Sequence, residues 1–157
     1  MSSQHCQGRN GLAVIAAVEA HTVRILPAPL NEPLGDFNCV MYALGLVGAL
    51  EHPCRPFGQY YADAAFLRSL IDYGVLQPCE PSPGALVTWS SGASLKHVGV
   101  LTASDRAASK WGCGHLCEHG LLEVPASMGN LLAFYSCSLG PADALEHLAR
   151  FHHWVLR

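Results

Sequence analysis

The chain has 157 residues, of which 50% are hydrophobic and 13% are charged, and its formal net charge is −3 with 9 Lys and Arg residues. This composition suits one compact domain with a substantial core and argues against intrinsic disorder. No basic run or aromatic and basic cluster is present, so nucleic acid is not an expected partner. No apolar run approaches the roughly 20 residues that span a bilayer, so a membrane is not expected either.

The chain carries 7 cysteines and 9 histidines, which is many for its length. An odd number of cysteines beside an ordinary core argues against a disulfide framework and favours reduced thiols in a cytosol-like compartment. The apolar stretch Leu12–Val18, preceded by the single basic residue Arg9, resembles a secretory signal only weakly. We therefore expect a cytoplasmic protein, with non-classical export as the alternative.

In chain order, residues 1–10 form a polar lead, and residues 11–26 are apolar without a clear period, compatible with a helix or a strand. Residues 26–33 are a proline-rich connector. No repeat, low-complexity tract or linker follows. The sequence thus predicts one domain over residues 1–157, with its core at about 36–137.

The stretch after the connector predicts a helix that carries a candidate nucleophile. Asp36 and Asn38 are good N-cap residues, and the apolar, glycine-interrupted run behind them predicts a helix from Cys39 to Leu50. Cys39 falls in its first turn, where unpaired N–H groups and the positive end of the helix dipole favour a thiolate over a thiol. The alternative is a small buried hydrophobe.

The remaining elements change from helical to strand patterns. Asp63 is expected to cap a second helix, whose apolar face includes Phe66 to Tyr73 and which Gly74 ends. Strands are expected at residues 85–90, 97–103, 107–111, 121–124 and 131–137. Pro141 opens a last amphipathic helix. Helices first and a meander second predict an α+β fold, in which an antiparallel sheet packs against the Cys39 helix.

A cysteine nucleophile needs a base, and His97 is the candidate. It stands at the beginning of an apolar strand, where a side chain can reach a cleft, although an ordinary exposed histidine at a strand end is the alternative.

The order of these features resembles the papain-like superfamily in its bacterial form, the NlpC-type cell-wall peptidases and the CHAP amidases. In those families a helix-start Cys precedes a Pro-x-x-Gly-Asp-Leu-Val strand, and a second strand begins His-Val-Gly or His-Val-Ala. The match lies in residues 38–45, 81–89 and 97–101. The resemblance covers about residues 36–125. It implies a papain-like fold and a thiol protease or amidase that acts on a peptide or amide substrate, with Cys39 as nucleophile and His97 as base. No cofactor is expected.

Two positions depart from the family pattern. Ala85 stands where the family has Asp, and Ser109 stands about twelve positions after the base, where NlpC-type enzymes have a polar orienting residue. CHAP-type sequences have Glu and Asn just before a Trp-Gly, which corresponds to Trp111-Gly112 here. Ser109, His119 beyond that turn, or a backbone carbonyl or water is therefore expected to orient the base. Lys110 has no acceptor and should point away.

The oxyanion hole is expected to include the backbone N–H of Cys39. Asn38 and Asn31 are the polar candidates for its second member, and Trp111 is a candidate for the wall of the cleft.

A last cluster comprises Cys113, His115, Cys117 and His119. Two Cys and two His would suit tetrahedral zinc, but side chains spaced two apart on a straight strand diverge instead of converging on one point, so we expect no metal there. The sequence thus favours a cysteine-dependent hydrolase of peptide or amide bonds. The alternatives are a catalytically inactive papain-like binding module and a small zinc-binding protein.

Overall fold

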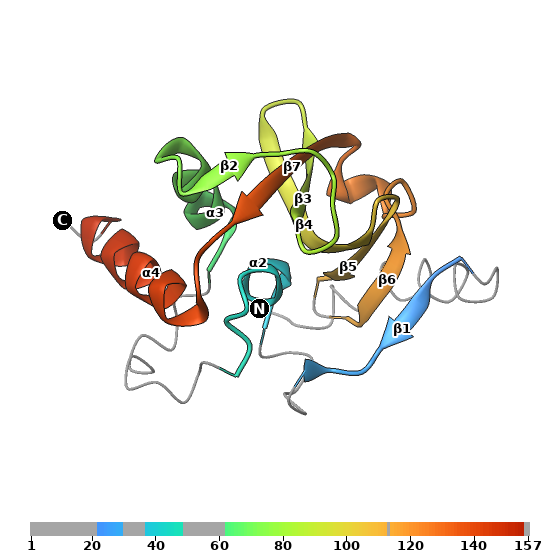
Figure 1. Cartoon of the computed structure of the whole chain (residues 1–157), viewed down its shortest axis with the longest axis horizontal. Coiled ribbons are helices and arrows are strands. Elements are labelled where there is room, and N and C mark those ends of the chain that lie inside the picture. The colour runs from blue at the N-terminus through green and yellow to red at the C-terminus, as the bar shows by residue number, and fades with distance from the viewer. Residues whose placement is uncertain (1–21, 30–36, 49–61, 113, 156–157) are drawn as a thin grey trace.

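The computed structural model describes residues 22–29, 37–48, 62–112 and 114–155 (Figure 1). These residues form a mixed α+β fold, with one 7-stranded antiparallel sheet and a C-terminal helix. The α+β class and the antiparallel sheet predicted from the sequence are therefore confirmed. Within the described ranges, no helix combines the length and the apolar character needed to cross a membrane.

The described elements run from β1 to α4 in chain order. They are β1 Arg24–Leu26, α2 Cys39–Ala43, α3 Ala64–Asp72, β2 Leu76–Pro78, β3 Leu86–Ser91, β4 Ser94–Ala103, β5 Arg106–Lys110, β6 Leu116–Gly120, the 3-10 helix η4 Ala126–Met128, β7 Leu131–Cys137 and α4 Pro141–Val155. The strand order in the sheet is β1-β6-β5-β4-β3-β7-β2. Strands β3 to β6 form a meander, in which β3, β4 and β5 correspond to predicted strands, and β7 returns to pair with β3 on its other side.

Helix α2 is shorter than the sequence predicted. The Asn38 side chain caps its start by accepting a hydrogen bond from the Met41 N–H at 2.9 Å. The helix ends at Ala43, because Gly45 adopts φ 67° and the Leu46 N–H donates to the Met41 carbonyl at 2.8 Å, which closes a Schellman turn. The predicted continuation of the helix beyond Gly45 is therefore wrong. The other predicted cap, Asp36, lies outside the described residues.

Helix α3 follows its prediction closely. The Asp63 carboxylate accepts a hydrogen bond from the Phe66 N–H at 2.9 Å, and Gly74 adopts φ 69° just beyond the last turn. The buried face consists of Phe66, Leu67 and Leu70. Tyr73 is an exception to the predicted apolar face: it is 82% exposed, because it follows the last helical residue.

The strand predicted at 121–124 is wrong. The last strand of the meander is β6, which ends at Gly120, and residues 121–122 already lie in a turn. Strand β6 reads Leu-Cys-Glu-His-Gly, without the β-branched residues that usually mark a strand. Pairing with β5 on one side and β1 on the other forms it instead. The sequence therefore carries no local signal for β6.

The sheet has a different covering on each face. Helices α2, α3 and α4 share one core with the first face, which contributes Leu86, Val98 and Val100, and the predicted apolar side of α4 (Leu145, Leu148 and Phe151) packs there. On the second face, Val87, Trp89, Leu101 and Ala107 pack with Leu121 and Val124 from the segment that follows β6. We call these the helix face and the loop face of the sheet.

Gly99 allows β4 and β5 to approach closely, and this generates a prediction about stability. A Cβ atom on Gly99 would lie 2.8 Å from the Ala108 carbonyl oxygen and 2.9 Å from the Ser109 Cβ. Because neither atom can move without moving the strand, we expect Gly99→Ala to lower the free energy of unfolding by about 1–3 kcal/mol, measured by urea denaturation.

Gly140→Ala is the control for Gly99→Ala. Its new Cβ would meet only the Asp143 carboxylate oxygen, at an ordinary 3.6 Å. Gly140 precedes α4, where Ala is a poorer residue than Gly, so a loss of under about 1 kcal/mol is expected. Equal losses in the two variants would contradict the close-approach explanation.

Candidate active site

A buried chain of hydrogen bonds holds the ring of His97. Its Nε2 lies 2.9 Å from Ser109 Oγ, and the same oxygen lies 2.7 Å from Nε2 of His119. The Trp111 indole N–H also donates to Ser109 Oγ, at 3.1 Å, and Nδ1 of His119 lies 2.8 Å from the Gly120 carbonyl oxygen. Ser109 and His119, which the sequence left as alternatives, therefore belong to the same chain of hydrogen bonds.

Strand pairing explains why these side chains meet. Strand β5 pairs with β4, as predicted for the strand that carries Ser109. Across β5 and β6, Ser109 lies opposite Cys117 and Ala107 lies opposite His119. Directly opposite residues share a face of the sheet, so Ser109 and His119 both point to the loop face, where His97 reaches them.

Aromatic rings enclose this chain of hydrogen bonds. The ring centroid of Trp89 lies 5.2 Å from that of His97 and 5.7 Å from that of His119, and the Trp111 ring packs at a tilt against His119, with 5.4 Å between the centroids. His97 is only 3% exposed. Its Nδ1 makes no hydrogen bond to another described residue.

Burial sets the protonation state of both histidines. It lowers the pKa of His97 to about 3, and the neighbouring His119 acts in the same direction. Burial also lowers the pKa of His119, against the raising effect of its hydrogen bond to the Gly120 carbonyl and of Glu123. Both imidazoles are therefore neutral at neutral pH.

Cys39 lies on the helix face of the sheet. Helix α2 packs against β4 and β5, and the half-buried Cys39 side chain contacts the core that contains Val98. Burial raises the pKa of the Cys39 thiol, although the backbone N–H groups of Val98, Val40 and Cys39 and the charge of Lys110 act against this. The N–H groups at the helix start act in the expected direction, but desolvation outweighs the few such groups of a five-residue helix, so the thiol and not the thiolate is favoured.

The nucleophile and base candidates approach β4 from opposite faces. Successive strand residues alternate, so Val98 points toward Cys39 while His97 points to the loop face. In the described part of the chain, no hydrogen bond joins Cys39 Sγ to the His97 ring. The thiol nevertheless lies beside the Val98 N–H, the peptide group that directly follows His97. The two residues thus approach β4 from opposite sides at His97 and Val98. The strand begins at Ser94, so the prediction that His97 stands at the beginning of its strand is wrong.

Lys110 points away from His97, as predicted. It is fully buried on the helix face, where its Nζ lies 5.1 Å from the centroid of the Phe37 ring and donates to the Gly112 carbonyl at 2.8 Å. Its charge favours ionisation of Cys39 and of Cys117.

Of the candidates for the oxyanion hole and the cleft wall, the described residues include Asn38 and Trp111. Both ends of the Asn38 amide are engaged locally: the oxygen caps α2, and the nitrogen donates to the Ala62 carbonyl at 2.7 Å. This gives Asn38 a role in holding the start of α2. Asn31 lies outside the described residues. Trp111, the candidate for a cleft wall, is 1% exposed and donates to Ser109 instead.

The residues of the candidate zinc cluster do not converge in the described ranges. Cys113 lies outside them, and His115 is exposed. The Cys117 thiol is buried, with its Sγ 3.8 Å from the His115 carbonyl oxygen, and both ring nitrogens of His119 have hydrogen-bond partners. Among the described residues, no group of three His, Cys, Asp or Glu side chains is placed to hold a metal ion.

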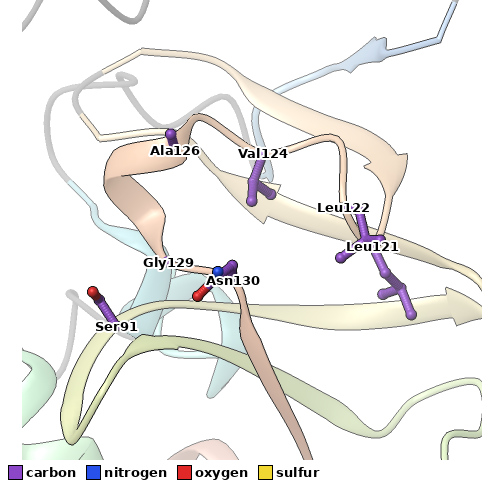
Figure 2. A pocket seen from close by; sticks show the side chains of 7 residues that line it. All are labelled: Ser91, Leu121, Leu122, Val124, Ala126, Gly129 and Asn130. Atoms are coloured by element: carbon purple, nitrogen blue, oxygen red, sulfur yellow. The ribbon is translucent and has the colours of Figure 1, made fainter.

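A pocket that the sequence did not indicate opens beside the loop face (Figure 2). It has a volume of about 360 Å³, and it is lined by Ser91, Leu121, Leu122, Val124, Ala126, Gly129 and Asn130. None of the catalytic candidates lines it. The Trp89 indole N–H donates to the Leu121 carbonyl at 2.7 Å, which ties one wall of the pocket to the ring that packs on His97.

No family model, curated protein or solved structure matches the chain. A functional assignment therefore depends on the geometry of the site itself.

The buried His97 predicts a loss of stability in acid. The unfolded chain protonates this ring near its ordinary pKa of 6.5, whereas the folded chain resists protonation down to about 3. The free energy of unfolding should therefore be greatest above pH 6.5 and fall as the pH drops from 6.5 toward 3. Denaturant titrations across this range measure the slope, which His97→Gln should reduce. His115→Gln, at an exposed position outside the network, should leave the slope unchanged, and an unchanged slope in His97→Gln would contradict the assignment.

Proposed function

We propose that the protein is a papain-like cysteine hydrolase of peptide or amide bonds, with Cys39 as nucleophile and His97 as base. The observation that carries the proposal is the 2.9 Å hydrogen bond between His97 Nε2 and Ser109 Oγ. A catalytic imidazole needs a partner on its second nitrogen, and Ser109 supplies one at the position, twelve residues on, where the resembling families have their orienting residue.

The proposed reaction begins with both groups neutral. The Cys39 proton moves to Nδ1 of His97 as the sulfur attacks the substrate carbonyl, because burial disfavours a separate thiolate and imidazolium pair. The imidazolium then protonates the leaving amine, and water hydrolyses the thioester with His97 again acting as base.

Charge on the sulfur and on the carbonyl oxygen needs stabilisation in this reaction. The N–H groups of Cys39, Val40 and Val98 lie beside the thiol and favour its ionised form, as does the Lys110 charge. The backbone N–H of Cys39 is the proposed donor to the oxyanion, and Asn31 remains the candidate for the second donor. The substrate class that we propose is a peptide or amide, including peptidoglycan-type and γ-glutamyl-type links.

A second candidate function is a papain-like binding module without catalysis. The observation that favours it is the placement of Cys39 and His97 on opposite faces of β4, without a hydrogen bond between them in the described residues. The raised pKa of Cys39 also fits an inert thiol.

Hydrolysis assays separate the two functions. On a panel of peptide, γ-glutamyl and peptidoglycan-derived amides, we expect Cys39→Ala to abolish hydrolysis while costing little stability, since a half-buried thiol leaves a small cavity. Cys137→Ala removes another half-buried thiol, on β7, and should retain activity. Hydrolysis that survives Cys39→Ala would refute the proposal, and binding without turnover in the wild-type protein would favour the module.

The raised pKa of Cys39 gives a second prediction. The rate of alkylation by iodoacetamide follows the thiolate fraction, so it should keep rising as the pH passes the usual range for a thiol. Mass spectrometry of the Cys39 peptide measures this rate. A plateau that extends to acidic pH would instead show a preformed thiolate and imidazolium pair, contrary to the neutral resting state.

A further inference from the structure

The positions of the hydrogen atoms in the buried network follow from its two ends, the Trp111 indole and the Gly120 carbonyl. An indole nitrogen can only donate, so Trp111 gives its hydrogen to Ser109 Oγ. A backbone carbonyl can only accept, so Nδ1 of His119 carries the hydrogen that it shares with Gly120. In neutral His119, Nε2 is then without a hydrogen and must accept.

The hydroxyl of Ser109 transmits this constraint to His97. A hydroxyl has one hydrogen to donate, and Ser109 must give it to Nε2 of His119, 2.7 Å away. The remaining partner of Ser109 Oγ is Nε2 of His97, which therefore has to donate. A hydrogen on Nε2 of the neutral ring leaves Nδ1, which makes no hydrogen bond to another described residue, as the acceptor.

We propose that His119 is a positioning residue, which fixes the tautomer of His97 through the Ser109 hydroxyl so that Nδ1 of His97 is free to accept a proton. The catalytic consequence rests on the function proposed above, whereas the tautomer itself does not. Without an acceptor at position 119, the Ser109 hydrogen has one remaining acceptor, Nε2 of His97. That ring would then carry its hydrogen on Nδ1 and could not take the Cys39 proton.

A matched pair of variants tests this relay. His119→Leu keeps an apolar side chain of related size but has no acceptor. His119→Gln keeps both an acceptor for the Ser109 hydroxyl and a donor for the Gly120 carbonyl. In protein labelled with ¹⁵N-histidine at pH 7.5, two-bond ¹H–¹⁵N correlations report which ring nitrogen of His97 carries the hydrogen. His97→Gln and His115→Gln assign the resonances by their disappearance.

The expected result is an Nε2–H tautomer for His97 in the wild type and in His119→Gln, and an Nδ1–H tautomer in His119→Leu. If His119→Leu fails to fold, Ser109→Ala replaces it. That variant removes the acceptor of the His97 hydrogen, so both tautomers should appear. An Nε2–H tautomer that persists alone in folded His119→Leu or in Ser109→Ala would overturn the proposal, and so would an Nδ1–H tautomer in the wild type.

Hydrolysis provides the readout for catalysis. We expect His119→Leu to lose about 10²–10⁴-fold in kcat, the usual contribution of general-base catalysis, and His119→Gln to lose far less. If the wild-type protein hydrolyses nothing, the proposed function fails, while the NMR arms still decide the relay. If the tautomer inverts in His119→Leu without a loss of kcat, the relay exists but His97 is not the base.

Discussion

The Ser109 hydroxyl is the interaction on which the site depends. One oxygen lies within hydrogen-bond distance of nitrogens on His97, His119 and Trp111, which come from β4, from β6 and from the residue that follows β5. Such a convergence needs neighbouring strands at close range, and Gly99 provides it because any Cβ there would touch Ser109. A buried polar network stabilises a fold when its polar atoms have partners, and here Ser109 Oγ, both ring nitrogens of His119 and Nε2 of His97 have them. The requirement for satisfied partners thus specifies both the register of the meander and the arrangement of the site.

Burial orients the proposed base at this site, but it also keeps both catalytic candidates uncharged. Aromatic rings around His97 and His119 exclude water and strengthen the hydrogen bonds that orient the base. The same burial lowers the pKa of His97 to about 3 and raises that of Cys39, so neither group ionises readily in the resting protein. In such an active site the proton of Cys39 has to move to His97 during attack on the substrate, because no thiolate and imidazolium pair forms beforehand. The rate of such a site therefore depends more strongly on the tautomer of His97 than the rate of a site with a preformed ion pair would.

Local chemistry was the part that the sequence predicted well. The cap Asp63, the stop Gly74 and the helix start Pro141 each act through a property of one residue, and the structure has all three where the sequence placed them. The spacing of twelve from His97 to Ser109 suits two strands joined by a short turn, so their contact was also predictable. Strand β6 was not, because its residues are ordered by pairing with β1 and β5. The raised pKa of Cys39 was missed since it depends on how desolvation compares with the helix N–H groups, which a sequence does not show.

A single bulge next to His97 decides which face Leu95 occupies. Trp89 lies opposite His97 but Ser90 lies opposite Leu95, so β4 holds one extra residue at this point. Leu95 packs on the helix face with Val98, whereas His97 points to the loop face, although a regular strand would place Leu95 and His97 on one side. The bulge therefore turns Leu95 toward the core of the helix face, whereas His97 keeps the regular alternation of β4 and shares the loop face with Leu101. The hydrolase and the binding module differ in one quantity, the separation of Cys39 Sγ from Nδ1 of His97 when a substrate is bound beside His97 and Val98. A separation within hydrogen-bond distance would allow proton transfer, and a larger one would leave an ordered imidazole without a nucleophile.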